Sequence, residues 1–163
     1  YITSALLRHL LESERPPRRL VLTVQREVAQ RICALPGDLS LLALSVQVYG
    51  QPTIADHIPA GAFYPPPKVD SAVVRIDLFD TPAISPPLLE SFFQLIKAGF
   101  SQKRKTLRNA LSGGLGWPPA RAAALLAPAA AIDPQRHAET LSLEEWNKLA
   151  EAYQTLPGNQ TLH

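Results

Sequence analysis

The chain has 163 residues, of which 46% are hydrophobic and 18% charged, and its formal net charge is +2. This length suits one full domain, or one small domain joined to part of another. The composition is that of an ordinary globular protein. No apolar run is long enough to cross a membrane and no signal peptide opens the chain, so we expect a cytoplasmic protein without a membrane partner. Cys33 is the only cysteine, which excludes a disulfide framework and predicts a small core residue.

The first half of the chain alternates between helical and extended patterns. Hydrophobic spacing predicts a helix over residues 2–13, a strand buried on both faces over 20–24 and a helix over 25–35. Residues 44–55 are expected to be extended, and the alternation over 69–78 predicts a further strand. This order is what the second half of a doubly wound α/β sheet would supply. Three strands alone would leave an open edge and an uncovered face, so we expect further strands before the first residue.

The second half has no strand signal. It follows a proline-rich stretch at residues 81–87, which we interpret as a domain boundary. The pattern predicts four helices, over residues 88–99, 103–111, 120–126 and 142–150. A Gly-Gly pair at 113–114 is expected to end the second helix, and a Ser-x-x-Glu capping box to begin the fourth.

Basic side chains gather in one part of this nearly neutral chain. No acidic residue occurs between Glu90 and Asp133, but six basic residues do: Lys97, Lys103, Arg104, Lys105, Arg108 and Arg121. Such a segment suggests either a localised anionic partner or a solvated helix face. On a helix, Lys97, Arg104 and Arg108 would share a face that could hold phosphate groups.

The sharpest local feature is the sequence Phe-Tyr-Pro-Pro-Pro-Lys-Val-Asp-Ser at residues 63–71. Consecutive prolines fix φ and hold the backbone extended, so the aromatic rings before them are presented from a stiff loop. A ring held in this way can stack on a nucleobase. The alternative is that Phe63 fills a junction between domains.

This sequence resembles the target-base loop of the ribosomal RNA adenine dimethyltransferases, and further segments resemble that family in the same order. They are the strand-to-helix segment at residues 23–31, the basic motif Phe-Ser-Gln-Lys-Arg-Lys-Thr-Leu-Arg-Asn at 100–109, and the two segments at 133–136 and 138–142. The resemblance covers nearly the whole chain. It implies the C-terminal part of a Rossmann-like, S-adenosylmethionine-dependent methyltransferase sheet, followed by a small all-helical domain.

The resemblance also implies roles for individual residues. Tyr1 aligns with the tyrosine of the family's Asn-x-Pro-Tyr motif, so Tyr1 and Phe63 would clamp a flipped adenine from opposite sides as catalytic residues. The implied RNA-binding residues are Lys68, Lys97, Lys103, Arg104, Lys105 and Arg108. The family's glycine-rich loop and its acidic cofactor-binding residues would precede Tyr1, so we expect no cofactor-binding residue in this chain. The four histidines lack metal-ligand spacing, and no metal site is expected.

We therefore expect an incomplete catalytic domain over residues 1–80, a helical RNA-binding domain over 86–156 and a flexible tail over 157–163. The implied activity of the intact protein, expected to be a monomer, is dimethylation at N6 of adjacent adenosines of small-subunit (16S) ribosomal RNA in the pre-ribosomal particle. By itself the chain is not expected to bind S-adenosylmethionine usefully. Two alternatives remain. One is a non-catalytic RNA- or DNA-binding module derived from the family, and the other is a relative that modifies large-subunit RNA and confers antibiotic resistance.

Overall fold

A computed structural model describes residues 2–158, and the chain divides into two compact units. The first unit contains the residues up to Leu35 together with Leu42–Ala83, and the second contains Pro36–Leu41 together with the residues from Ile84 onward. No local pattern in the sequence predicts that Pro36–Leu41 packs with the later part of the chain. Its backbone is tied there because the amides of Gly37 and Leu39 both donate to the carbonyl of Glu139, at 2.9 and 3.3 Å.

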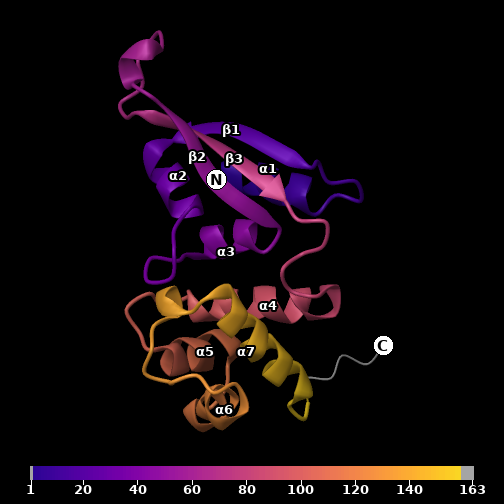
Figure 1. The fold of residues 1–163 in the computed structure, drawn as a ribbon. Coiled ribbons are helices and arrows are strands. Elements are labelled where there is room, and N and C mark those ends of the chain that lie inside the picture. The colour runs from indigo at the N-terminus through magenta and orange to yellow at the C-terminus, as the bar shows by residue number, and fades with distance from the viewer. Residues whose placement is uncertain (1, 159–163) are drawn as a thin grey trace. The chain divides into compact units, whose positions relative to one another are not determined.

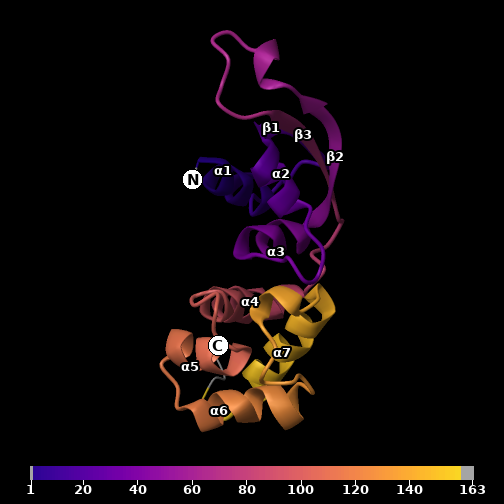
Figure 2. The same cartoon turned by 90° about the vertical axis from the view of Figure 1, so that its left-hand side faces the viewer.

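The first unit is a three-stranded antiparallel sheet in the order β1-β3-β2. Its elements are α1 (Ile2–Leu11), β1 (Arg19–Gln25), α2 (Arg26–Ile32), α3 (Leu41–Gln47), β2 (Gly50–Ile58), the short 3-10 helix η1 (Ala60–Ala62) and β3 (Ser71–Leu78). The helices α1, α2 and α3 lie on the same side of the sheet (Figure 2). The core between them is fully apolar and includes Leu7, Ala29, Ile32, Val46, Ala72, Val74 and Ile76.

The strand expected over residues 20–24 forms as β1, but the expectation that it is buried on both faces is wrong. Leu20 packs into the core, whereas Val21 is 61% exposed and Thr23 is also exposed. Antiparallel pairing with β3 gives β1 an alternating pattern, because successive side chains point to opposite faces of a sheet. Within the described residues, helices cover only the face that carries Leu20.

The expectation that residues 44–55 are extended is wrong for the first half of that range. Residues Leu41–Gln47 form α3, and the strand begins only at Gly50. The β-branched Val46 and Val48 favour a strand. The start of α3, Leu41-Leu42-Ala43-Leu44, consists of strong helix formers. Gly50 allows the close strand approach that follows, since a Cβ there would lie 2.7 Å from the carbonyl oxygen of Asp77.

The second unit is helical throughout its described part, as the sequence predicts (Figure 1). Its elements are α4 (Pro86–Gly99), α5 (Leu107–Leu115), α6 (Pro119–Ala124), the π-helical turn η2 (Leu125–Ala129), the 3-10 helix η3 (Ala138–Thr140) and α7 (Leu143–Thr155). The predicted capping box is confirmed: Ser142 Oγ accepts from the amide of Glu145, and Glu145 Oε1 accepts from the amide of Ser142. In the part of the chain that the structure describes, no helix combines the length and apolar character of a membrane span.

The helix expected over residues 103–111 is shifted along the chain. It begins at Leu107, because Thr106 is its N-cap and accepts a hydrogen bond from the amide of Asn109. The prediction that the Gly-Gly pair ends this helix is also wrong. Gly113 and Gly114 lie inside α5, which ends instead at Gly116 with a left-handed φ of 67°.

Candidate functional site

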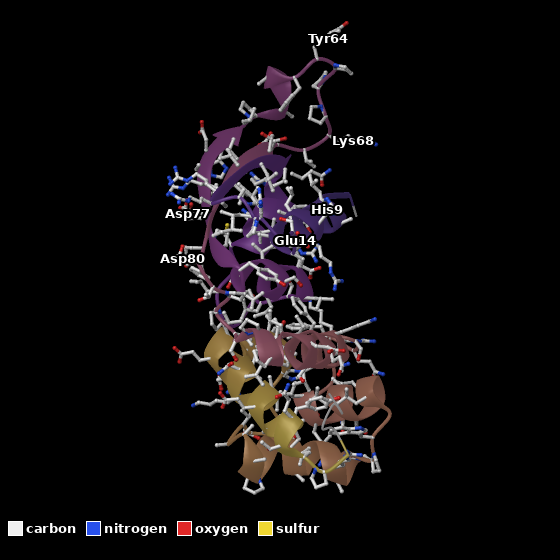
Figure 3. All side chains as sticks on the ribbon, turned by 90° about the vertical axis from the view of Figure 1, so that its right-hand side faces the viewer. His9, Glu14, Tyr64, Lys68, Asp77 and Asp80 are labelled. Atoms are coloured by element: carbon white, nitrogen blue, oxygen red, sulfur yellow. The ribbon has the colours of Figure 1, made fainter. Side chains whose placement is uncertain are left out.

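The Phe63 sequence forms an exposed loop between β2 and β3. After η1, the backbone of Phe63 is extended, with φ −103° and ψ 155°, and three prolines follow. Phe63 is 39% exposed, Tyr64 is 100% exposed, and Lys68 is also exposed. In Figure 3, Tyr64 lies at the tip of this loop, with Lys68 further along the same loop. The loop therefore presents two aromatic rings and one cation to solvent.

Asp70 ties the two ends of this loop together. Its Oδ1 accepts a hydrogen bond from the amide of Ala60 at 2.9 Å. Its main-chain carbonyl accepts from the amide of Arg26 at 3.0 Å, and its Oδ2 lies 3.9 Å from Nη1 of the same arginine. The aspartate thus joins η1, the start of β3 and the first residue of α2. Sequence reasoning included Asp70 in the motif without giving it this structural role.

Tyr1, the second expected catalytic residue, lies outside the described residues. The structure therefore gives no position for the ring that the resemblance places opposite Phe63. Tyr64 is the other aromatic side chain that precedes the prolines, and the family resemblance implies no role for it. Its position before the proline run was the available signal, because a residue that precedes proline is pushed towards extended backbone.

Three of the expected RNA-binding residues lie in a turn that connects α4 to α5. We call residues 101–105 the basic turn, and its exposed cations are Lys103, Arg104 and Lys105. The expectation that Arg104 shares a helix face with Lys97 and Arg108 is wrong, because Arg104 precedes the N-cap of α5. Lys97 lies in the last turn of α4, and Arg108 lies in the first turn of α5.

The basic turn is held at both ends by hydrogen bonds. At its start, the amide and hydroxyl of Ser101 both donate to the carbonyl of Ala98, at 3.2 and 2.6 Å. At its end, the carbonyl of Lys105 lies 3.0 Å from Nδ1 of His137. Two residues further on, the amide of Leu107 donates to the carbonyl of Arg136 at 2.7 Å. The turn is therefore fixed between α4 and the 133–137 segment, which limits the entropy it would lose when an anion binds.

Charge at the basic turn is not neutralised within the described residues. There, no carboxylate forms an ion pair with Lys97, Lys103, Arg104 or Lys105. Arg108 is half-buried, and its Nε donates to Oδ1 of the neighbouring Asn109 at 3.4 Å. Unpaired cations on a fixed turn are available to phosphate groups, which bind such clusters in a salt-dependent way.

Two of the ionisable groups with shifted pKa values, Cys33 and Asp77, lie in the first unit outside the loop. A hydrogen bond from Arg19 is the main cause that lowers the pKa of the Asp77 carboxyl on β3. Burial raises the pKa of the Cys33 thiol, which is partly buried and packs against the first unit's core at its edge. Among the described residues, no group of three or more His, Cys, Asp or Glu side chains could hold a metal ion.

The structure brings the expected residues together in two groups, one in each unit. Phe63 and Lys68 share the loop of the first unit. Lys97, Arg108 and the basic turn surround the junction of α4 and α5 in the second. The first group can stack on a base, and the second can hold phosphates.

Two solved structures share this fold. A dimethyladenosine transferase from Plasmodium falciparum aligns with a TM-score of 0.75 and 24% identity, over 91% of this chain and 62% of that one. The 23S rRNA methyltransferase ErmE aligns with a TM-score of 0.65 and 23% identity, over 93% and 60%. These likenesses confirm the expected fold class, an α/β unit with a Rossmann-like sheet followed by a helical domain.

Curated relatives are more similar in sequence. The ribosomal RNA small subunit methyltransferase A of Dehalococcoides mccartyi (strain CBDB1) is 50% identical over 153 residues, which is 94% of this chain and 52% of that relative. The protein of the same name from Desulfitobacterium hafniense (strain DSM 10664 / DCB-2) is 46% identical over 154 residues, 93% of this chain and 55% of the relative. The chain thus spans about half the length of the curated relatives it matches. The family model described as "Ribosomal RNA adenine dimethylase" matches residues 1–155. The chain belongs to the ribosomal RNA adenine dimethylase family.

Proposed function

We propose that this chain supplies the target-base loop and the RNA-binding surface of an S-adenosylmethionine-dependent adenine-N6,N6-dimethyltransferase that acts on small-subunit ribosomal RNA. The observation that carries this proposal is the loop between β2 and β3. The loop presents the partly exposed ring of Phe63, and a hydrogen bond between Asp70 and the Ala60 amide joins its two ends. The chain belongs to the adenine dimethylase family. We place the intact protein in the cytoplasm, as a monomer that acts on the pre-ribosomal particle.

The described residues do not themselves fit a cofactor site. The closely spaced glycines Gly113, Gly114 and Gly116 lie in and after α5, whereas a dinucleotide-type loop follows a strand and opens a helix. S-adenosylmethionine would supply the methyl group. The residues of this chain would act on the RNA.

The role proposed for Phe63 follows from the chemistry of the base. Adenine N6 is a weak nucleophile because its lone pair is delocalised into the ring, so the reaction depends on how the amine is oriented. A base inside a helix must leave its stack before any enzyme can reach N6. Phe63, on a stiff and anchored loop, would stack on one face of the flipped adenine. Tyr1, outside the described residues, is proposed for the opposite face.

The basic turn is proposed to bind the RNA backbone. Lys103, Arg104 and Lys105 make no ion pair within the described residues, and Lys97 and Arg108 flank them in sequence on α4 and α5. Contacts of this kind fix the position of a folded RNA without reading its sequence. Lys68, on the same loop as Phe63, would hold a phosphate near the target nucleotide.

The proposed activity can be tested with a fusion. This chain is joined to the part of the Dehalococcoides mccartyi relative that it does not match, and the purified fusion is incubated with S-adenosylmethionine and unmodified small-subunit ribosomal RNA. We expect mass spectrometry of the digested RNA to show N6,N6-dimethyladenosine. RNA binding without any methylated adenosine would contradict the proposed methyltransferase activity and favour a non-catalytic binding module. Methylation of large-subunit RNA alone would contradict the proposed substrate.

A further inference from the structure

We propose that Tyr64 is a second nucleotide-stacking residue, which contacts a nucleotide adjacent to the target adenosine. The inference rests on the proposed function, because it requires the loop between β2 and β3 to meet RNA. It adds a contact outside the pocket for the target base.

The first argument is that Tyr64 has no structural role in its unit. Its side chain is 100% exposed, and no hydrogen bond of its hydroxyl occurs within the described residues. A ring in this position contributes no packing to the fold. Burying such a ring against another planar group is favourable, since aromatic side chains remove a large apolar area from water.

The second argument is the direction of the two neighbouring rings. Phe63 has extended backbone angles, and Tyr64 precedes a proline, which also favours extended backbone. Successive side chains of an extended chain point to opposite sides. This geometry directs Phe63 and Tyr64 to opposite sides of the chain and therefore towards different bases. If Phe63 contacts the flipped adenine, Tyr64 faces a different nucleotide.

The third argument concerns the surroundings of the ring. Between His57 and Asp70 the chain contains no acidic residue, and the Asp70 carboxylate is held by the Ala60 amide and Arg26. Lys68 is exposed on the same loop as Tyr64 (Figure 3). An exposed ring and a cation on one loop are the combination with which proteins bind single-stranded nucleic acid, where the ring stacks on a base and the cation meets the backbone. The loop therefore favours an RNA partner over an apolar protein surface.

The test uses the complete 163-residue chain and an RNA stem-loop whose adenine-rich loop carries 2-aminopurine beside the target position. Binding is measured by fluorescence anisotropy, and stacking is measured by quenching of the 2-aminopurine. We expect Tyr64→Ala to weaken binding by about fivefold or more and to abolish the quenching. Tyr64→Phe, which keeps the ring, should bind within about twofold of the unmodified chain, given that stacking needs only the ring face.

Phe79→Ala is the matched control, because Phe79 is an aromatic residue 43% exposed on the same unit but outside the loop. It should leave binding unchanged. The melting temperature of Tyr64→Ala should also be unchanged, which separates lost contact from lost fold.

Three outcomes would overturn the inference in different ways. If the unmodified chain fails to bind the RNA, both the proposed RNA-binding function and the role of Tyr64 are wrong. If the unmodified chain binds and Tyr64→Ala binds equally well, the inference alone is wrong. If Tyr64→Ala binds naked RNA normally but loses affinity for small-subunit particles, the ring contacts a protein and not a nucleotide.

Discussion

Arg136 and Glu145 form a bidentate ion pair in the second unit, close to the starts of α5 and α7. Nη1 of Arg136 donates to Oε2 of Glu145, and Nη2 donates to Oε1 at 3.1 Å. The same Oε1 accepts from the amide of Ser142, which closes the capping box of α7. The main-chain carbonyl of Arg136 accepts from the amide of Leu107, the first residue of α5. The pair therefore links α7 to the helix that follows the basic turn.

Because of this ion pair, we expect the folded chain to lose stability in acid. The hydrogen bond from Arg136 is the main cause that lowers the pKa of Glu145. Because the pKa is lower in the folded state than the unfolded value of about 4.3, the ionised carboxylate stabilises the fold above that pH. The contribution is lost as the pH falls from about 4.3 through the folded-state pKa. Urea unfolding between pH 3 and pH 7 should show this decline.

Glu145→Gln is the control for the acid effect. The variant should be less stable at pH 7, by about 1–3 kcal/mol, since a hydrogen-bonded charge pair is broken. It should also lose less stability than the unmodified chain between pH 5 and pH 3. An unchanged acid profile would show that other carboxyl groups, such as Asp77 on β3, cause the decline.

Two neighbouring glycines of α5 predict opposite effects on stability. A Cβ on Gly114 would lie 2.6 Å from Cα of Ala98 on α4, which leaves no room for it. Gly114→Ala should therefore destabilise the fold by about 1–3 kcal/mol. On Gly113, a Cβ would meet only Nε2 of Gln102, at 3.5 Å. Gly113→Ala should stabilise the helix by about 0.5–1 kcal/mol, because glycine is a poor helix former.

Thermal unfolding of the two glycine variants measures this difference. A melting temperature that falls equally in both would contradict the close packing of α4 against α5. The pair is informative because the same methyl group is added to the same helix one residue apart.

Asp70 is expected to control the order of the loop that carries Phe63. Asp70→Ala removes the acceptor of the Ala60 amide and the partner of Arg26. We expect the loop to lose about 1.4 kcal/mol or more of local stability. The Ala60 amide hydrogen should therefore exchange with solvent at least tenfold faster. Asp70→Asn keeps an oxygen acceptor and should retain most of the protection. Equal exchange in all three proteins would show that the prolines alone hold the loop.

The basic turn predicts a change in the salt dependence of RNA binding. Replacing Lys103, Arg104 and Lys105 by glutamine should reduce the slope of log K against log salt by about 2, since each phosphate contact contributes about 0.7 for single strands. The matched control replaces three exposed cations elsewhere, Arg15, Arg18 and Lys148. A slope that changes equally in both triple variants would show attraction by net charge alone, without a defined site.

Much of the fold could be predicted from the sequence, and the errors have physical causes. The strands β1 and β3, the helices α1, α2, α4 and α7, and the Ser142 capping box follow from local periodicity and capping chemistry. Periodicity predicts a start of α5 that is too early, because Lys and Arg favour helix and the Thr106 cap sets the true start. Gly114 resembles a helix end in the sequence, but its close contact with Ala98 joins α5 to another helix.

The candidate site was only partly accessible to sequence reasoning. The stiff loop could be predicted because proline restricts its own backbone and that of the residue before it. The anchoring by Asp70 could not, since it depends on how the ends of β2 and β3 meet the start of α2. The clustering of basic residues was visible in the sequence, but their arrangement on a turn required the position of the 133–137 segment.

The most direct test of the account is a comparison of methyl transfer and RNA affinity in the fusion that carries Phe63→Ala. If Phe63 orients the flipped adenine, the rate of dimethyladenosine formation should fall at least a hundredfold, about 2.7 kcal/mol or more of transition-state stabilisation, while the Kd for RNA changes by less than about fivefold. Equal losses in rate and affinity would contradict the role of Phe63 at the target base and leave the loop as a simple RNA contact.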